Sequence, residues 1–347
     1  MTDTPIPNSQ QPFRVGVVGA GSMGKNHARI FGGLEDAQLS AILDDRADVA
    51  QDIAAKYHAR AVANLDEFTN AVDAATIATP TVTHFAIAKH LLEHGKHVLV
   101  EKPFVETPEQ ARELCALAQK QNVVLQVGHI ERFNPVLSAL EARLAHPRFI
   151  EATRLSPYPG RSLDVGVVLD VMIHDLEIIL HLVRSPWVQV DAVGVPILSK
   201  REDIANVRLR FQNGCVANIT ASRISQDKLR KIRVFQPDAY LSLDYQNQSG
   251  YLLRLARDDE KESSLLGKLL GVAADATIVT EFAGKRIVRE PVEVDKGEPL
   301  KRELADFVAC ARAGAQPKVG GYEATAALEL ALEITRQIEQ NQTHAPS

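Results

Sequence analysis

The sequence has few of the features that indicate a cross-linked, metal-bound or membrane-spanning chain. Its 347 residues include only three cysteines, Cys115, Cys215 and Cys310, which lie far apart among apolar or small neighbours. Their spacing fits neither a disulfide framework nor a cysteine metal site, so we expect buried free thiols. No apolar run reaches the length of a membrane-spanning helix.

The chain also lacks an excess of positive charge and a recognisable export signal. It carries 39 Lys and Arg against 44 Asp and Glu, a formal net charge of -5, which argues against broad binding to nucleic acid. Residues 1–12 are polar and contain proline, without the basic and apolar regions of a signal peptide, so we expect a disordered tail there. We therefore expect a soluble, cytoplasmic protein, and its length predicts two domains.

The first strong pattern is Phe13–Gly24, which is F-R-V-G-V-V-G-A-G-S-M-G. A β-branched run predicts a buried strand, and G-x-G-x-x-G spacing followed by a helical pattern predicts a dinucleotide site. Gly19 permits the turn, Gly21 lets the backbone approach a pyrophosphate, and Gly24 lets the helix pack on the strand. Asp44 follows twenty residues after Gly24, where a carboxylate can bind a ribose 2′-hydroxyl and repel a 2′-phosphate.

These residues predict that the cofactor is NAD. The predicted contacts in this stretch are Gly19, Gly21, Ser22, Met23, Gly24 and Asp44. Arg46 lies two residues after Asp44 and could tolerate a 2′-phosphate, which leaves some use of NADP open. The alternative is a glycine-rich structural turn, with Asp44 as a solvated strand end.

Between residues 13 and 127, strand patterns alternate with helical ones, which predicts βαβ units around a parallel sheet. The strand expected at Ala74–Ala78 ends in Thr79 and Pro80. Ligands bind at the carboxyl edge of such sheets, so we expect Thr79 and Pro80 to contact the cofactor. His84 lies one turn into the next helix and is a further candidate. Its alternative role is that of a partly buried helix residue.

The strand expected at His97–Val100 continues into Glu101, Lys102 and Pro103. A lysine at this edge would point toward the nicotinamide and could bind a substrate hydroxyl and act as an acid or base. Glu101 could neutralise Lys102 or bind ribose. A surface Lys–Glu pair in a loop is the alternative.

In the second half, apolar residues at helical intervals predict one helix over Val168–Val183. Asp170 and His174 are four residues apart and project from one side of it. A histidine beside a carboxylate is a plausible proton acceptor, and a solvent-facing Asp–His pair or a satisfied core histidine is the alternative. Asp175 and His181 lie nearby, but no zinc-binding spacing is present, so we expect no metal.

Runs with period-two alternation follow from residue 188 to 257. Val207, Leu209 and Phe211 alternate with Arg208 and Arg210, which is typical of an antiparallel sheet with one covered face. An open face invites self-association, so we expect a homodimer or homotetramer.

The predicted fold class is an α/β Rossmann domain with a parallel sheet, followed by an α+β domain with a large, open and mostly antiparallel sheet. The expected segments are the tail at 1–12, the NAD-binding domain at 13–135, the substrate and oligomerisation domain at 136–298 with a loop over 258–275, and C-terminal helices at 299–347 that pack back on the first domain.

Four motifs carry a resemblance to a known family. They are G-A-G-S-M-G at 19–24, A-T-P-T at 78–81, E-K-P at 101–103 and D-x-x-x-H at 170–174. With them the chain resembles the Gfo/Idh/MocA family of sugar and cyclitol dehydrogenases. The resemblance implies that Lys102 is the catalytic lysine, and that His174 with Asp170 completes the catalytic group.

Three further stretches, at 128–135, 157–161 and 170–177, resemble the branch of this family that acts on UDP-sugars. That likeness implies oxidation of the C3 hydroxyl of UDP-N-acetylglucosamine and a partner aminotransferase in the synthesis of a 3-amino sugar for lipid A. The expected substrate contacts, besides Lys102, Asp170 and His174, are Arg132, Arg154 and Arg161 for the diphosphate, and Asn134 and Tyr158 for the sugar or base. Scattered surface arginines are the alternative, as are another sugar or inositol as substrate, or a non-catalytic NAD-binding regulator.

Overall fold

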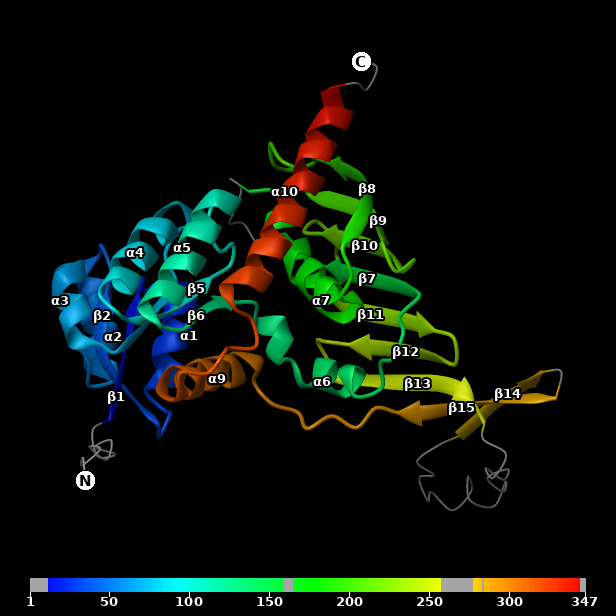
Figure 1. Cartoon of the computed structure of the whole chain (residues 1–347), viewed down its shortest axis with the longest axis horizontal. Coiled ribbons are helices and arrows are strands. Elements are labelled where there is room, and N and C mark those ends of the chain that lie inside the picture. Colours follow the sequence, from blue (N-terminus) through cyan, green and yellow to red (C-terminus); the bar gives the residue numbers. More distant parts are fainter. Residues whose placement is uncertain (1–11, 159–164, 257–276, 283, 344–347) are drawn as a thin grey trace, which may run out of the picture. The chain divides into compact units, whose positions relative to one another are not determined.

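The computed structural model describes residues 12–158, 165–256, 277–282 and 284–343 (Figure 1). Residues 1–11 of the tail expected at 1–12, Arg161 and the loop expected at 258–275 lie outside the described residues. Contacts divide the chain into two compact units. The first comprises the described residues up to His129 together with Leu300–Thr325, and the second comprises Ile130–Pro299 together with the chain from Ala326 onward.

The first unit contains a parallel six-stranded sheet in the order β3-β2-β1-β4-β5-β6. This is the order of a Rossmann fold, in which the direction of winding reverses between β1 and β4 and ligands bind at that reversal. The strands are β1 (Phe13–Val18), β2 (Ala37–Leu43), β3 (Arg60–Ala61), β4 (Ala74–Ile77), β5 (His97–Glu101) and β6 (Leu125–Gly128).

Helices cover this sheet, and α4 and α5 pack against each other (Figure 1). The helices are α1 (Ser22–Phe31), α2 (Ala47–Lys56), α3 (Leu65–Ala71), α4 (Thr81–Glu93), α5 (Pro108–Gln121), α9 (Pro299–Ala313) and the start of α10 (Gly321–Thr343). Thr107 caps α5, since its side chain accepts a hydrogen bond from the N–H of Gln110. β4 is buried throughout, as its run of small and β-branched residues predicts.

The second unit contains a nine-stranded sheet in the order β14-β15-β13-β12-β11-β7-β10-β9-β8. All its strand pairs are antiparallel except β7 with β10. The strands are β7 (Phe149–Leu155), β8 (Trp187–Val195), β9 (Ile204–Phe211), β10 (Val216–Ser222), β11 (Leu229–Gln236), β12 (Ala239–Asp244), β13 (Ser249–Leu255), β14 (Thr277–Phe282) and β15 (Lys285–Pro291).

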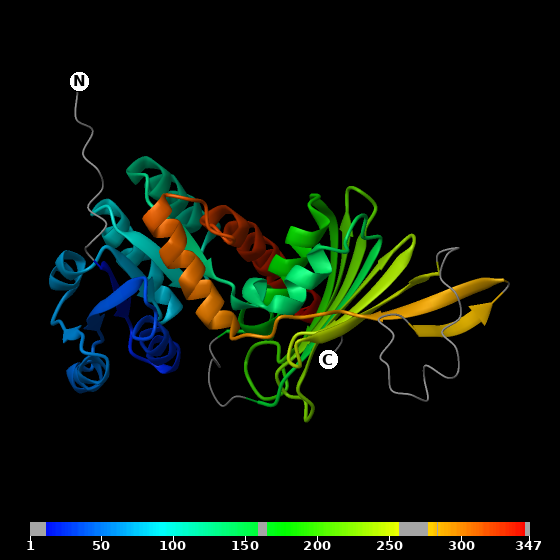
Figure 2. The same cartoon turned by 90° about the horizontal axis from the view of Figure 1, so that it is seen from below.

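One face of this sheet packs on helices (Figure 2). They are the 3₁₀ turn η1 (Ile130–Phe133), α6 (Pro135–Glu141), the π turn η2 (Val168–Met172), α7 (Ile173–Val183) and the later part of α10. In β9, Val207 and Leu209 are buried in this core while Arg208 and Arg210 are exposed, which confirms the expected alternation. The fold class predicted from the sequence is therefore confirmed.

Two expectations differ from the structure. The single helix expected over Val168–Val183 is a π turn followed by α7. Hydrophobic spacing over only five residues is too short a pattern to distinguish α from π winding. The last helix, expected on the first domain, contributes Leu330 and Ile334 to the core of the second unit. No helix in the described part of the chain combines the length and apolar character needed to cross a membrane.

Candidate active site

The glycine turn between β1 and α1 has the geometry of a dinucleotide cradle. Gly19 has φ +90°, and a side chain there would lie 2.7 Å from the carbonyl oxygen of Ala78, so only glycine fits without strain. A Cβ on Gly24 would lie 1.7 Å from the carbonyl oxygen of Gly19, so close packing of helix on turn requires this glycine too. A Cβ on Gly21 would meet open space within 4 Å. That space and the first-turn N–H groups at the start of α1 suit a pyrophosphate.

Asp44 is held at the end of β2, beside this turn. Its carboxylate accepts hydrogen bonds from the N–H of Ala20 at 2.6 Å and from the N–H and Nε of Arg46 at 2.9 and 3.0 Å. Burial opposes ionisation of Asp44, but these hydrogen bonds and the Arg46 charge outweigh it and lower the pKa of the carboxyl group. A charged acceptor is thus fixed where the sequence predicts a ribose partner. The side chain of Arg46 is 62% exposed and already paired with Asp44.

His84 links two turns at the same edge of the sheet. It is 1% exposed. Its Nε2 lies 2.9 Å from the carbonyl oxygen of Thr79, and its Nδ1 lies 3.0 and 3.1 Å from those of Pro103 and Phe104. With both ring nitrogens facing backbone carbonyls, His84 holds the Thr79 turn beside the loop after β5. These contacts fit its alternative role as a buried helix residue, and direct contact with the cofactor stays a prediction.

Lys102 directly follows the end of β5 and is partly exposed. Its backbone N–H donates to Oε2 of Glu101 at 3.3 Å, and Oε1 of Glu101 lies 3.0 Å from Nε2 of the fully buried His27. A Cβ on Gly128 would come within 3.0 Å of this carboxyl group, so Gly128 leaves the space that Glu101 occupies. The side chain of Glu101 therefore points into the first unit, where its contacts with His27 and with the N–H of Lys102 fix the turn that carries Lys102. Its role as a ribose ligand stays a prediction.

Glu303 of α9 lies buried in the same unit, and sequence reasoning did not single it out. It is fully buried, and neither of its carboxylate oxygens has a hydrogen-bond partner among the described residues. Burial first, and then the negative charges of Glu101 and Asp306, raise its pKa well above the usual carboxyl value. Burial and these charges therefore favour the protonated form of Glu303. In the sequence, only the position of Glu303 among the apolar residues of a helix could have suggested that it is buried. The residues that surround it come from strands far away in the chain.

In the second unit, Asp170 lies in the π turn and His174 in the first turn of α7. Both side chains are partly exposed. The N–H of Asp170 donates to the carbonyl of Gly166 at 3.0 Å. One short helical segment therefore carries both predicted catalytic groups of this unit, and π turns of this kind are frequent at functional sites.

A buried network of charges lies beside this segment. Arg154 pairs with both oxygens of Asp175 at 2.9 and 2.8 Å and with Glu131 at 2.8 Å. Arg132 donates to Glu177 at 2.7 Å. Burial opposes the charge of Arg154, but the two carboxylates outweigh it and raise its pKa further above its usual value. All five residues are at most 7% exposed.

This network changes the interpretation of several predicted substrate contacts. Arg132 and Arg154 are engaged with internal carboxylates, and Asn134 donates to Glu131 at 3.1 Å and to the carbonyl of Tyr245 at 3.0 Å. These three side chains therefore take part in internal contacts, and their direct contact with the substrate stays a prediction. Tyr158 is partly exposed, and Arg161 lies outside the described residues.

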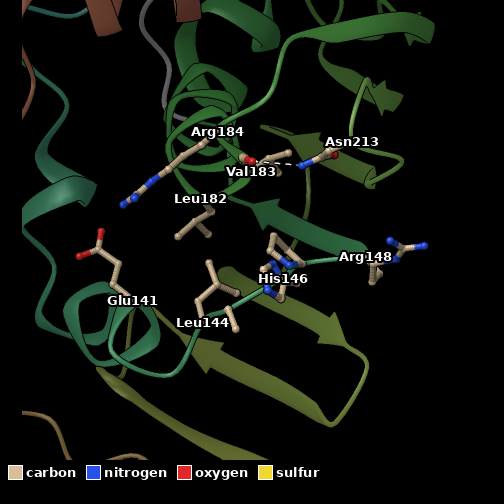
Figure 3. A pocket seen from close by; sticks show the side chains of 10 residues that line it. Glu141, Leu144, His146, Arg148, Leu182, Val183, Arg184 and Asn213 are labelled. Carbon is tan, nitrogen blue, oxygen red and sulfur yellow. Dashed lines mark hydrogen bonds between the residues drawn. The ribbon is translucent and has the colours of Figure 1, made fainter.

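A cavity of about 410 Å³ in the second unit contains none of the predicted site residues (Figure 3). Glu141, His146 and Arg184 are among the residues that line it. It lies at the carboxyl end of α7, whereas His174 lies at the opposite end of that helix. The described residues include no group of three His, Cys, Asp or Glu side chains arranged to hold a metal ion.

Two family models match the chain. Residues 13–129 match the GFO/IDH/MocA oxidoreductase family with its NAD-binding Rossmann fold, and residues 138–241 match a GFO/IDH/MocA C-terminal domain. The UDP-N-acetylglucosamine 3-dehydrogenase of Acidithiobacillus ferrooxidans is 34% identical over 328 residues, which cover 94% of this chain and 97% of the relative. An inositol 2-dehydrogenase of Rhizobium meliloti is 30% identical over 60% of this chain and 68% of its own length.

Solved structures agree with these matches. A structure of the UDP-N-acetylglucosamine 3-dehydrogenase GnnA from Acidithiobacillus ferrooxidans superimposes with a TM-score of 0.84 and 34% identity, over 95% of this chain and 98% of that one. The likeness extends over both units, and the first unit has the cradle and the acidic residue that NAD requires. The chain therefore belongs to the GFO/IDH/MocA family, as a sugar oxidoreductase that uses NAD.

Proposed function

We propose that this enzyme oxidises the C3 hydroxyl of UDP-N-acetylglucosamine to a ketone. The observation that carries the proposal is the likeness to UDP-N-acetylglucosamine 3-dehydrogenase over nearly the whole of both chains, at 34% identity. The inositol dehydrogenase match covers 60% of this chain, so it favours that substrate class less. A non-catalytic regulator would not need Lys102 or His174, and both are present.

In the proposed mechanism the first unit binds the cofactor. Gly19–Gly24 cradle the pyrophosphate, Asp44 binds the adenosine ribose, and Thr79 and Pro80 lie at the neighbouring strand end. NAD supplies the hydride acceptor. The charged, fixed carboxylate of Asp44 disfavours a 2′-phosphate, so NADP is a poorer cofactor.

Lys102 from the first unit and His174 from the second are proposed to act on the same hydroxyl group. As the C3–H bond breaks and hydride leaves, the O–H bond breaks and one of these two side chains accepts the proton. Asp170 orients the imidazole from the preceding turn. The buried Arg154 network helps to fix the first turn of α7, because Arg154 binds Asp175, the residue next to His174.

The proposal includes the wider setting expected from the sequence. Nucleotide sugars and NAD are cytoplasmic metabolites, so the enzyme works in the cytoplasm. The 3-keto product is the substrate class of an aminotransferase, which would make a 3-amino sugar. The exposed face of the nine-stranded sheet is proposed to pair two or four copies, and sedimentation as a monomer at micromolar concentration would contradict this.

The test is NADH formation over a panel of UDP-N-acetylglucosamine, UDP-N-acetylglucosaminuronate, UDP-glucose, free N-acetylglucosamine and inositol. We expect the highest kcat/KM for UDP-N-acetylglucosamine and a rise in melting temperature with UDP alone, because the nucleotide supplies binding energy remote from the reacting carbon. Preference for inositol, with no effect of UDP, would assign the enzyme to another branch of the family.

A further inference from the structure

The helical segment that carries Asp170 and His174 begins without a cap of its own. Its N-cap residue is Val167, which has helical backbone angles and makes no side-chain capping bond. Val167 and Val168 are fully buried, so water cannot satisfy their N–H groups. Buried N–H groups at a helix start must find acceptors elsewhere.

Glu202, in the loop between β8 and β9, supplies these acceptors. Its carbonyl oxygen accepts from the N–H of Val167 at 2.9 Å, and its side-chain Oε1 accepts from the N–H of Val168 at 3.3 Å. Glu202 is 3% exposed. Burial raises the pKa of Glu202 despite the hydrogen bond from Val168, and a carboxyl oxygen accepts from an N–H group in either protonation state. One residue from a distant loop therefore provides the missing cap.

The loop that carries Glu202 is itself fixed. The Asp203 carboxylate accepts from the N–H groups of Ile197, Leu198 and Ser199 at 2.6 to 2.9 Å. Arg223, fully buried, donates from Nε to Asp203 at 2.9 Å and from Nη1 to the carbonyl of Val165 at 2.8 Å. The loop and the segment before the helix are therefore bound to the same arginine.

The contact between Glu202 and the helix start leaves no spare room. A Cβ added to Gly166 would lie 1.8 Å from Oε1 of Glu202. The backbone of Gly166 does not lie in the left-handed region, so alanine would be tolerated there if the carboxyl group were absent. A side chain at 166 and the Glu202 cap therefore exclude each other.

We propose that Glu202 is a positioning residue of the active site, which sets the start of the helix and hence the places of Asp170 and His174. This inference rests on the proposed function for the role of those two residues. The contacts that carry it lie wholly within the second unit. A shift of this helix start would displace both groups together, since Asp170 lies two residues beyond Val168 and its N–H is bonded to Gly166.

The first experiment compares Glu202→Ala with Glu202→Gln. Glutamine keeps a side-chain oxygen for the N–H of Val168, whereas alanine removes it. We expect Glu202→Ala to lower kcat about 100-fold, the scale of a misplacement of about 1 Å, with NAD affinity unchanged. We expect Glu202→Gln to stay close to the wild-type kcat. Equal losses in both variants, or an unchanged kcat in Glu202→Ala, would overturn the proposal.

The second experiment uses the steric conflict at Gly166. Gly166→Ala alone should lower kcat as Glu202→Ala does, because it displaces the carboxyl group. The double variant Gly166→Ala, Glu202→Ala should lose no more than Glu202→Ala alone, because the two changes remove one contact. If the losses in kcat of the two single variants add in the double variant, the two changes do not act through one contact, and the proposal is overturned.

A matched control is Glu141→Ala, which removes a contact to His181 at the other end of α7 (2.7 Å between Oε1 and Nε2). It should leave kcat unchanged. Hydrogen exchange of the amides from 167 to 174 supplies a readout independent of substrate, and Glu202→Ala should speed it while Glu141→Ala should not. If the wild type oxidises no nucleotide sugar, the proposed function fails, while the exchange result still decides the role of Glu202.

Discussion

The two units differ in how they accommodate buried carboxyl groups. In the second unit, Glu131 and Asp175 each pair with Arg154, and Glu131 also pairs with the partly exposed Arg230, so each carboxylate faces a cation. In the first unit, Glu303 is just as buried, but its carboxyl oxygens have no hydrogen-bond partner in the described chain. The pKa shifts follow from this difference.

Burial alone would raise the pKa of both kinds of group. Glu131 is buried, yet the Arg154 charge outweighs desolvation and lowers its pKa. Glu303 has no such cation, and the charges of Glu101 and Asp306 add to desolvation, so its pKa rises. A nearby arginine thus decides which of these two buried carboxyl groups favours its charged form.

The largest expected effect on stability comes from removing Arg154 from its buried ion network. Arg154→Met removes the cation of Asp175 and one of the two arginines that pair with Glu131, the other being Arg230 at 3.1 Å. We expect a loss of about 3–5 kcal/mol in the free energy of unfolding. Urea denaturation measures it. Arg233→Met is the control, since Arg233 and Glu151 form an exposed pair at 3.4 Å, and it should cost less than about 1 kcal/mol. Similar losses in both variants would mean that burial does not determine how much an ion pair contributes to the free energy of unfolding.

A smaller effect is expected at Glu303. Its folded-state pKa is raised, so the folded protein binds this proton more tightly than the unfolded chain does. The resulting stability is fully present below the unfolded carboxyl pKa, about 4.3, and is lost as pH rises through the folded pKa. Glu303→Gln cannot lose a proton, so its melting temperature should match the wild type at low pH and exceed it increasingly as pH rises.

Glu109→Gln is the control for that pH series. Glu109 is exposed in the first turn of α5, where hydrogen bonds from its own N–H and from Thr107 lower its pKa. Its contribution to the stability of the fold has the opposite pH dependence. That contribution is present above the unfolded pKa and is lost as pH falls through the folded pKa. A parallel pH dependence in wild type and Glu303→Gln would show that Glu303 is not a buried acid.

The smallest effect is expected at Tyr245. Its hydroxyl group is buried without a hydrogen-bond partner in the described structure, while its carbonyl accepts from Asn134. Tyr245→Phe removes an unsatisfied polar atom and keeps the ring, so stability should change by no more than about 1 kcal/mol, toward greater stability. A large loss on thermal unfolding would reveal a hydroxyl contact that supports the Arg154 network.

The same contrast explains what the sequence could predict. The glycine turn, Asp44 and Lys102 sit next to strands and turns whose residue patterns are local, so their placement at strand ends followed from spacing. The period-two runs likewise predicted the antiparallel sheet. These are features in which the sequence neighbours of a residue decide its environment.

The remaining features depend on residues far apart in the chain. Arg154 meets Glu131 and Asp175 across more than twenty positions, and Glu202 caps a helix that starts 34 residues earlier. The motif around Arg132 and Asn134 was predicted to contact the substrate, which stays a prediction, and its hydrogen-bond partners include residues of α7 and of the turn after β12. Pattern alone could not show that these groups bind one another.

The central claim is that the ammonium group of Lys102 acts on the sugar hydroxyl while the first unit holds NAD. The most direct test measures NADH formation from UDP-N-acetylglucosamine by Lys102→Ala, together with the NAD dissociation constant of the same variant. The account predicts a loss of turnover of about 100-fold or more, with NAD affinity close to that of the wild type. Turnover retained in Lys102→Ala would contradict it.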